Sequence, residues 1–216
     1  MIADLARIVP WACSLQHYTA KTPLLEIGEV FYVSVLATID PSLFIEAPSM
    51  SMIGYVKRVD QSLANQLMKG EGETDGLYEC SKEDEQAGLC LSLDKTWDGI
   101  DFLFRNGNRR NNPNSAYLGA KKSTYLEEEF GYGQAMLIAA SEVARIGDQL
   151  AQISDEDFSK RVEVHHTALI EQEVYPFSEG ETVADIDDYV TPYFKKLRSL
   201  FASASKAGDS VLFWVM

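Results

Sequence analysis

The C-terminal segment Val211–Val215 (VLFWV) constrains the fold more than any other part of the chain. Successive side chains of a strand point to opposite faces, so a strand with this sequence carries apolar side chains on both. Such strands are typical of the buried interior of a sheet. Gly208 stands shortly before the segment, in a position where a glycine commonly ends a helix. We therefore expect a helix that ends at Gly208 and leads into a buried strand.

Further strand patterns occur in the middle of the chain. Met52–Val59 (MIGYVKRV) and Tyr132–Ala139 are predicted strands. Asp60 then occupies the N-cap position of a short helix, Gln61–Lys69, which ends at Gly70.

Helix patterns alternate irregularly with these strands. Helices are predicted at Lys95–Arg105, from Ser141 to Ile153, after a capping-box sequence at Ser154, and around Thr191–Ala207, with Pro192 in its first turn or an earlier start at Asp187. This order predicts an α+β fold with a single mixed β-sheet packed with several helices.

The charge of the chain limits the partners that it can bind. Its 216 residues contain 19 Lys and Arg against 33 Asp and Glu, a formal net charge of −14. Nucleic acids and anionic membranes repel such a protein, so neither is expected as the main partner. The proportions of hydrophobic (46%) and charged (24%) residues are those of a globular protein, which excludes disorder over most of the length.

The sequence also indicates a cytoplasmic location. The longest apolar stretch, Val30–Ala37, is interrupted by Ser34 and is far shorter than the roughly 20 apolar residues of a membrane-spanning helix. The N-terminus lacks the basic region and clean apolar core of a signal peptide. Cys80 and Cys90 could in principle meet. With three cysteines and no CxxC spacing, however, we expect free thiols in a reducing cytoplasm.

Residues 1–49 differ from the rest of the chain. They contain several prolines and no sustained helical period, although Val30–Ile39 could form a strand. Turn-forming residues at Pro48 and Ser49 close the segment. We therefore predict two parts: an N-terminal extension, residues 1–49, that is loosely packed, and a domain over residues 50–216.

Three carboxylates, Asp94, Asp98 and Asp101, stand at positions i, i+4 and i+7. On a helix of 3.6 residues per turn they fall on one stripe, where they could bind a hard cation or act as a general acid and base. The alternative is an ordinary amphipathic helix with Asp94 as its cap. Asp98 and Asp101 would then be available to Arg105. No second cluster of acids or histidines at ligand spacing supports a metal site, so the structural interpretation is favoured.

A group of basic side chains interrupts the acidic sequence. It comprises Arg105, Arg109, Arg110, Lys121 and Lys122, with no acid between them. The Asn- and Gly-rich sequence predicts a loop over 106–122. Such a loop could bind a phosphate or a carboxylate. It could equally be a solvated loop balanced by the three acids at 127–129, and this second interpretation is favoured.

No pattern predicts a catalytic residue, and neither a metal nor a cofactor is expected. His165 and His166 are adjacent, so on a helix they point about 100° apart and cannot ligate one metal in the usual i, i+4 manner. No serine stands in a GxSxG sequence. Cys90 lies in an apolar run, where a thiol is commonly inert. The Gly-Tyr-Gly sequence at 131–133 precedes a strand, which favours a tight turn over a phosphate-binding loop.

Five short segments occur in one order along the chain. They are Met52–Tyr55 (MIGY), Leu91–Ile100 (LSLDKTWDGI), Phe130–Gly133 (FGYG), Tyr175–Pro176 (YP) and Gly208–Trp214 (GDSVLFW). Over about residues 50–216 this set resembles the YfbM-like family of small bacterial proteins, a domain of unknown function. Two positions depart from the family pattern, since Asp101 stands where a His is common and Gln134 where a Pro usually follows the turn. The resemblance implies a compact cytoplasmic α+β fold and no established activity, cofactor or catalytic residue.

Two functions are compatible with these features. The first is a non-catalytic protein-binding module, such as an immunity protein or antitoxin, whose acidic surface meets a basic protein. Unless they only keep the protein soluble, the acids of residues 71–85 would supply that surface: Glu71, Glu73, Asp75, Glu79, Glu83, Asp84 and Glu85. The alternative is an enzyme or a sensor that binds a small anionic ligand near Trp97 and the basic loop 105–122. Its expected binding residues are Asp94, Lys95, Trp97, Asp98, Asp101, Arg109 and Arg110.

Overall fold

The computed structural model describes residues 51–71, 76–109, 116–129 and 131–216. The chain divides into two units, Met1–Pro48 and Ser49–Met216, and the fold described below is that of the second. The predicted loose packing of residues 1–49 and the candidate strand at Val30–Ile39 lie outside the described residues, and both stay predictions.

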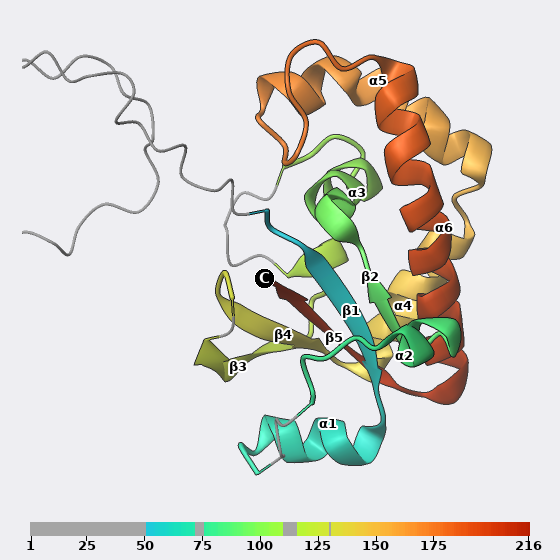
Figure 1. Cartoon of the computed structure of the whole chain (residues 1–216). Helices are drawn as coiled ribbons and strands as arrows, with labels where there is room; N and C mark the ends of the chain where they lie inside the picture. The colour runs from blue at the N-terminus through green and yellow to red at the C-terminus, as the bar shows by residue number, and fades with distance from the viewer. Residues whose placement is uncertain (1–50, 72–75, 110–115, 130) are drawn as a thin grey trace, which may run out of the picture. The chain divides into compact units, whose positions relative to one another are not determined.

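Within the described residues, five strands form one sheet in the order β2-β1-β5-β4-β3 (Figure 1). The strands are β1 (Gly54–Val59), β2 (Cys90–Ser92), β3 (Ser123–Glu129), β4 (Gln134–Ile138) and β5 (Ser210–Val215). The central strand β5 pairs with β1 along its whole length, from Gly54 opposite Val215 to Val59 opposite Ser210. On its other side β5 pairs with β4. The C-terminal apolar segment is therefore the middle of the sheet.

Helices cover both faces of this sheet. They are α1 (Gln61–Met68), α2 (Lys82–Gln86), α3 (Trp97–Phe104), α4 (Ala140–Ala151), α5 (Asp155–Glu171) and α6 (Val183–Ala207), with short 3-10 turns η2 (Asp94–Thr96) and η3 (Tyr117–Gly119). Figure 1 shows the long helix α6 beside the sheet, with α4 and α5 next to it and α1 apart from them. No helix in this part of the chain is long and apolar enough to cross a membrane.

The two faces of β5 belong to two different hydrophobic cores. Val211 and Phe213 lie in the larger core, which contains the apolar side of α6 with Phe194. Leu212 and Trp214 lie in the smaller core, together with Leu67 of α1. These four side chains of β5 are at most 6% exposed. The predicted buried strand is confirmed, and its apolar sequence follows from having a core on each face.

The predicted α+β fold with one sheet is confirmed, but the sheet is antiparallel rather than mixed. Among the described strands, all four neighbouring pairs run antiparallel. Two neighbouring strands are parallel or antiparallel according to whether the connection between them crosses to the opposite end of the sheet. The order of strands and helices along the sequence does not give this information. The prediction of a mixed sheet was therefore wrong, because local sequence patterns do not indicate the direction of each strand.

Several predicted helix ends are confirmed. Asp60 caps α1, with its Oδ1 atom accepting from the Leu63 amide at 2.9 Å. Ser154 caps α5 in the same way through the Asp157 amide, at 3.0 Å. Gly208 ends α6 in the left-handed conformation, with φ of 74°. In each case the cap is a local interaction, which is why the sequence predicts it.

Other boundaries differ from the prediction. Helix α6 begins at Val183, before both predicted starts, because Thr182 and Asp185 form a capping box. Pro192 therefore lies inside the helix. Helix α4 begins one residue before Ser141, and no side chain caps it. Helix α2 and strand β3 were not predicted at all. Strand β3 forms a hairpin with β4, a pairing that its own acidic sequence does not reveal.

Candidate functional site

Trp97, at the start of α3, joins four of the five segments that carry the family resemblance. Its indole Nε1 donates to the Met52 carbonyl oxygen at 3.2 Å. Its ring centroid lies 6.3 Å from that of Tyr175 and 6.1 Å from that of Phe213. A Cβ atom added at Gly54 would lie 2.5 Å from the Cβ atom of Trp97, so only glycine fits there. These segments therefore form one packed unit around the indole.

Asp98 lies beside the same unit and faces the chain that follows α5. Its Oδ2 atom accepts from the Tyr175 amide at 3.3 Å. The Tyr175 hydroxyl in turn accepts from the Met52 amide at 3.0 Å. The peptide bond between Tyr175 and Pro176 is cis. Asp98 thus helps to hold Tyr175 between the N-terminal edge of the domain and α3.

Asp101 is a buried structural carboxylate, with only 2% of its surface exposed. Its Oδ2 atom accepts from Arg105 Nε at 2.9 Å, and its Oδ1 atom accepts from the Leu118 amide at 2.6 Å. Arg105 also donates to the Ala116 carbonyl oxygen at 2.6 Å. The Asp101–Arg105 ion pair therefore connects α3 to the turn η3. The contact between Asp101 and Arg105 is the one that the structural interpretation of the acidic stripe predicted.

Asp94 does not cap α3, because it lies within η2 in the left-handed conformation, with φ of 49°. Its Oδ2 atom accepts from the Tyr189 hydroxyl of α6 at 2.7 Å. Burial raises the pKa of Tyr189, and the hydrogen bond to the Asp94 carboxylate raises it further. Burial also raises the pKa of neighbouring Tyr193. Both phenols therefore stay protonated at neutral pH, and Tyr189 serves as a hydrogen-bond donor that joins η2 to α6.

The three carboxylates of the predicted stripe thus have three different partners. Each holds a different segment of the chain, so they do not converge on one point of the surface. Lys95, which lies between Asp94 and Trp97 in the sequence, is half-buried. Binding of a ligand by these residues stays a prediction.

The basic side chains of the loop 105–122 also have separate neighbours. Arg105 is engaged by Asp101, whereas exposed Arg109 has its Nη2 atom 3.5 Å from the Glu173 carbonyl oxygen, just after α5. Lys121 and Lys122 are exposed immediately before β3. Arg110 lies outside the described residues. Of the two predicted anion-binding arginines, the described one therefore lies against the chain after α5, two residues before Tyr175, and its binding of an anion stays a prediction.

The two adjacent histidines have separate neighbours. His165 Nε2 lies 3.3 Å from Asn106 Oδ1, and His166 Nε2 lies 2.8 Å from the Glu181 carbonyl oxygen. Among the residues that the structure describes, no three His, Cys, Asp or Glu side chains are grouped to hold a metal ion.

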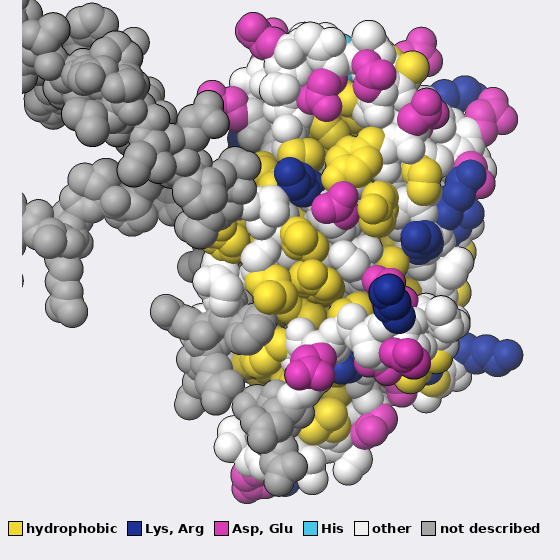
Figure 2. All heavy atoms as spheres, viewed as in Figure 1, with side chains coloured by type: hydrophobic (Ala, Val, Ile, Leu, Met, Phe, Trp, Pro, Cys, Tyr) yellow, Lys and Arg dark blue, Asp and Glu magenta, His cyan; other side chains and the backbone are white. Residues whose placement is uncertain are grey.

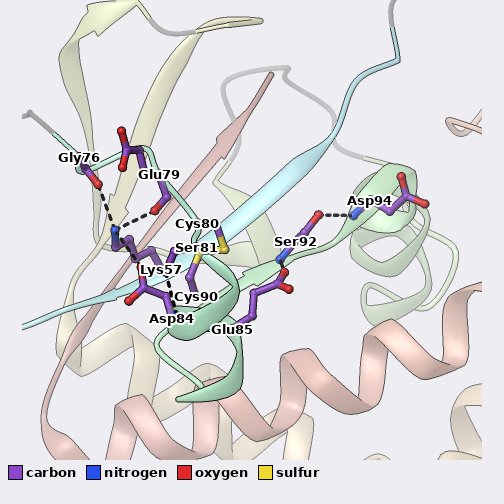
Figure 3. Close-up of a disulfide and its surroundings, with 10 residues drawn as sticks. All are labelled: Lys57, Gly76, Glu79, Cys80, Ser81, Asp84, Glu85, Cys90, Ser92 and Asp94. Carbon is purple, nitrogen blue, oxygen red and sulfur yellow. Dashed lines mark hydrogen bonds and ion pairs between the residues drawn. A yellow bond between two sulfur atoms is a disulfide. The ribbon is translucent and has the colours of Figure 1, made fainter.

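Cys80 and Cys90 form a disulfide, with their Cα atoms 5.7 Å apart (Figure 3). The expectation of free thiols at these positions was wrong. Lys57 of β1 explains how the two cysteines meet, since its Nζ atom donates to the Gly76 and Glu79 carbonyl oxygens at 3.1 and 2.8 Å. These bonds hold the segment before Cys80 against the sheet that contains Cys90. A separation of 10 residues does not by itself indicate this contact.

The disulfide gives a direct test in solution. Of the three cysteines, only Cys13 should react with a thiol reagent in denatured, unreduced protein, and all three should react after reduction. Closing a loop of this size restricts the unfolded chain, so the Cys80→Ser/Cys90→Ser variant should lose about 2–3 kcal/mol of unfolding free energy. Urea unfolding measures the loss, and Cys13→Ser is the control. Three reactive thiols before reduction would contradict the disulfide.

Glu142, in the first turn of α4, is a second buried carboxylate that no sequence pattern singled out. Its side chain is 8% exposed and lies 2.8 Å from Arg145 Nη2. Its Oε2 atom also accepts from the Lys121 amide at 2.9 Å. The hydrogen bond from the Lys121 amide, and then that from Arg145, lower the pKa of this carboxyl. Glu142 thereby fixes the chain that enters β3 to the start of α4.

Glu142→Gln should make stability less dependent on pH. The folded pKa lies below the ordinary value of 4.5, so the carboxylate stabilises the fold above that pH and loses this contribution as pH falls through the folded pKa. We expect the variant to lose about 1–2 kcal/mol at neutral pH, and the difference to shrink as the pH falls below 4.5 and through the lowered folded pKa. Urea unfolding across this range measures it, with Glu156→Gln as an exposed control. A pH-independent difference would exclude this role.

The described surface carries an acidic region that no motif in the sequence indicated. Residues 162–194 contain no Lys or Arg and eight acids: Glu163, Glu171, Glu173, Glu179, Glu181, Asp185, Asp187 and Asp188. They span the later part of α5, its connection to α6 and the first part of α6. Figure 2 shows acidic side chains over this end of the molecule and hydrophobic side chains gathered over the middle of the same face. A count of charges in windows along the sequence could have found this region.

Comparisons with known proteins agree with this fold. The family described as "Domain of unknown function (DUF1877)" matches residues 50–214. The crystal structure of YfbM, a protein of unknown function from Escherichia coli, is similar with a TM-score of 0.51 and 23% identity. The match covers 76% of this chain and 99% of that one, and at this identity it shows the fold alone. No curated protein matches. The resemblance predicted from the five segments is confirmed, and the chain belongs to the DUF1877 family, of which residues 50–214 form the domain.

Proposed function

We propose that the protein is a non-catalytic binding module whose acidic surface meets a basic protein, in the manner of an immunity protein or antitoxin. The observation that carries the proposal is the acidic region of residues 162–194, with eight acids and no Lys or Arg. Six of these acids are exposed: Glu163, Glu171, Glu173, Glu179, Asp185 and Asp188. A continuous potential of one sign speeds the encounter with a partner of opposite charge and rejects partners of like charge.

This region supports the proposal better than the acids of residues 71–85. In that stretch Asp84 lies 3.9 Å from Lys57, and Glu85 accepts from the Ser92 amide at 2.9 Å. Glu73 and Asp75 lie outside the described residues. The later region has no Lys or Arg within its own sequence, and the exposed Arg109 beside it contacts the Glu173 carbonyl oxygen rather than a carboxylate. The proposed binding surface is therefore that of α5 and the first part of α6.

The alternative, an enzyme or sensor with a ligand near Trp97, has less support. The acids that it requires are engaged by Tyr189, by the Tyr175 amide and by Arg105. A ligand would have to displace contacts that hold the fold together. This arrangement favours binding through the outer surface over chemistry at the start of α3.

A cytoplasmic location is part of the proposal and conflicts with one feature. Disulfides such as Cys80–Cys90 persist mainly in oxidising compartments. Alkylation of thiols in intact host cells, before lysis, tests the location. Reduced Cys80 and Cys90 would support the cytoplasm, whereas a retained disulfide would argue for an oxidising compartment.

Affinity capture from the native host, followed by salt titration, tests the function. The test variant carries Glu171→Gln, Glu173→Gln, Glu179→Gln and Asp188→Asn. The matched control loses the same charge from exposed acids elsewhere: Glu71→Gln, Glu83→Gln, Asp148→Asn and Glu156→Gln. We expect a basic protein to be captured at low salt by the wild type and the control, and at least about tenfold more weakly by the test variant.

Two results would contradict the proposal. Capture of no protein at low salt would remove the binding function altogether. Equal weakening by the test variant and the control would show that net charge, rather than the region of residues 162–194, governs the association.

A further inference from the structure

A pocket of about 460 Å³ lies at the end of the sheet where α1, β3, β4, β5 and α4 meet. Its polar lining comes from Gln61 of α1, from Lys122 just before β3, from Ser123 and Thr124 of β3, from Ser141 of α4, and from Ser210 of β5. Leu137 and Met68 contribute apolar surface. This volume is in the range of small-molecule sites. The pocket is separate from Trp97 and from the acidic region of residues 162–194, neither of which contributes to its lining.

The N-terminus of α4 opens into this pocket without a cap. The helix has 12 residues, and Ala139 at its N-cap position makes no side-chain hydrogen bond to it. The first amides of an α-helix have no partner within the helix. Those of Ala140 and Ser141 belong to residues that line the pocket. The partial positive charge of the helix N-terminus adds to these donors, which favours an anion.

Ser210 is an independent indication of a ligand. The residue is 2% exposed and lines the pocket. Its hydroxyl makes no hydrogen bond to another side chain or backbone group within the described residues. Every second side chain of β5, that is Ser210, Leu212 and Trp214, lies on the same face of the sheet as the smaller core. A polar side chain is unusual on this apolar face. The Ser210 oxygen is not among the fully buried unpartnered atoms of the described residues, so it is accessible from the pocket, where a ligand could donate to it or accept from it.

The acids near the pocket are already engaged. Asp60 caps α1, and Asp209 lies 2.7 Å from Arg58 Nη2. Glu142 is bound by the Lys121 amide and by Arg145, and it does not line the pocket. Lys122 is the cationic side chain in the lining. The local balance of charges therefore favours an anion even though the whole chain is acidic.

We propose that this pocket binds a phosphate monoester. The phosphate oxygens would accept from the amides of Ala140 and Ser141, from the hydroxyls of Ser141 and Ser210, and from Lys122. The apolar wall of Leu137 and Met68 would contact the organic part of the molecule. This site goes beyond the proposed partner surface, since it adds a small ligand at a different part of the domain.

Titration of the full-length, 15N-labelled protein with inorganic phosphate, at constant ionic strength, tests the site. We expect saturable shifts of the Ala140 and Ser141 amide resonances that chloride does not reproduce. Lys122→Gln should weaken binding about tenfold, the loss of one charged contact, whereas the matched Lys121→Gln should leave it within about twofold. Unsaturable shifts, or equal effects of the two lysine variants, would overturn the proposal.

Two further variants separate binding from folding. Proline is tolerated at the first position of a helix, so Ala140→Pro removes one amide donor with little effect on α4. Ser210→Ala removes the unpartnered hydroxyl and should leave the urea midpoint unchanged or raised. Both should weaken phosphate binding while capture of a basic protein is unchanged. Unaltered phosphate binding in both variants would exclude this site without bearing on the acidic partner surface.

Discussion

Asp101→Ala should lose about 3–5 kcal/mol of unfolding free energy, because it removes one partner of a buried ion pair. Asp101 is 2% exposed and bonds to both Arg105 and the Leu118 amide. Without the carboxylate, Arg105 is left in a partly buried site and the Leu118 amide loses its acceptor. Urea unfolding followed by circular dichroism measures the loss.

Asp98→Ala is the matched control, since Asp98 lies on the same helix but is half-buried and accepts a longer bond, 3.3 Å, from the Tyr175 amide. We expect it to cost about 1 kcal/mol. The comparison separates the two interpretations of the acidic stripe. Acids held together for a ligand would repel one another in its absence, so removal of any one would stabilise the apoprotein. A gain of stability in Asp101→Ala would therefore contradict the structural role.

Trp97→Ala should lose about 3 kcal/mol, the lower end of the range for removal of a large aromatic side chain, because Trp97 is half-buried. The substitution leaves a cavity between Gly54, Tyr175 and Phe213. It also removes the donor to the Met52 carbonyl oxygen. Thermal and urea unfolding measure the effect.

Trp97→Phe tests which part of this contribution is packing. It keeps an aromatic ring and loses the indole N–H, so we expect a loss of about 1 kcal/mol. Lys95→Ala, two residues away and half-buried, should change stability little. Full stability in Trp97→Ala would show that the indole contributes nothing to the packing of these segments, and would contradict its structural role.

The acids at 94, 98 and 101 show where prediction from the sequence stops. Helical spacing correctly brings Asp101 within reach of Arg105, since i and i+4 are neighbours on any helix. The same spacing places Asp94 on the stripe, yet the chain is not α-helical before Trp97, and Asp94 points towards Tyr189. Tyr189 lies 95 residues later, so no local pattern indicates the contact.

The pocket and the disulfide depend in the same way on distant parts of the chain. Ser210 and Ser141 line the same pocket because β5 lies beside β4 in the sheet, and β4 leads directly into α4. Cys80 meets Cys90 because Lys57 holds the segment before Cys80 against the sheet. Neither can be predicted without the order and direction of the strands. The order of the sheet, β2-β1-β5-β4-β3, differs from the order in sequence.

Local patterns were sufficient to predict the buried strand at Val211–Val215, the caps at Asp60, Ser154 and Gly208, the family and the excess of acid. Side-chain periodicity and capping involve residues within a few positions of one another, and net charge is a sum over residues. The partners of the three aspartates, the antiparallel sheet, the disulfide and the pocket emerged only from the folded chain. Each of these requires the approach of segments far apart in sequence, which depends on how the two cores pack around β5.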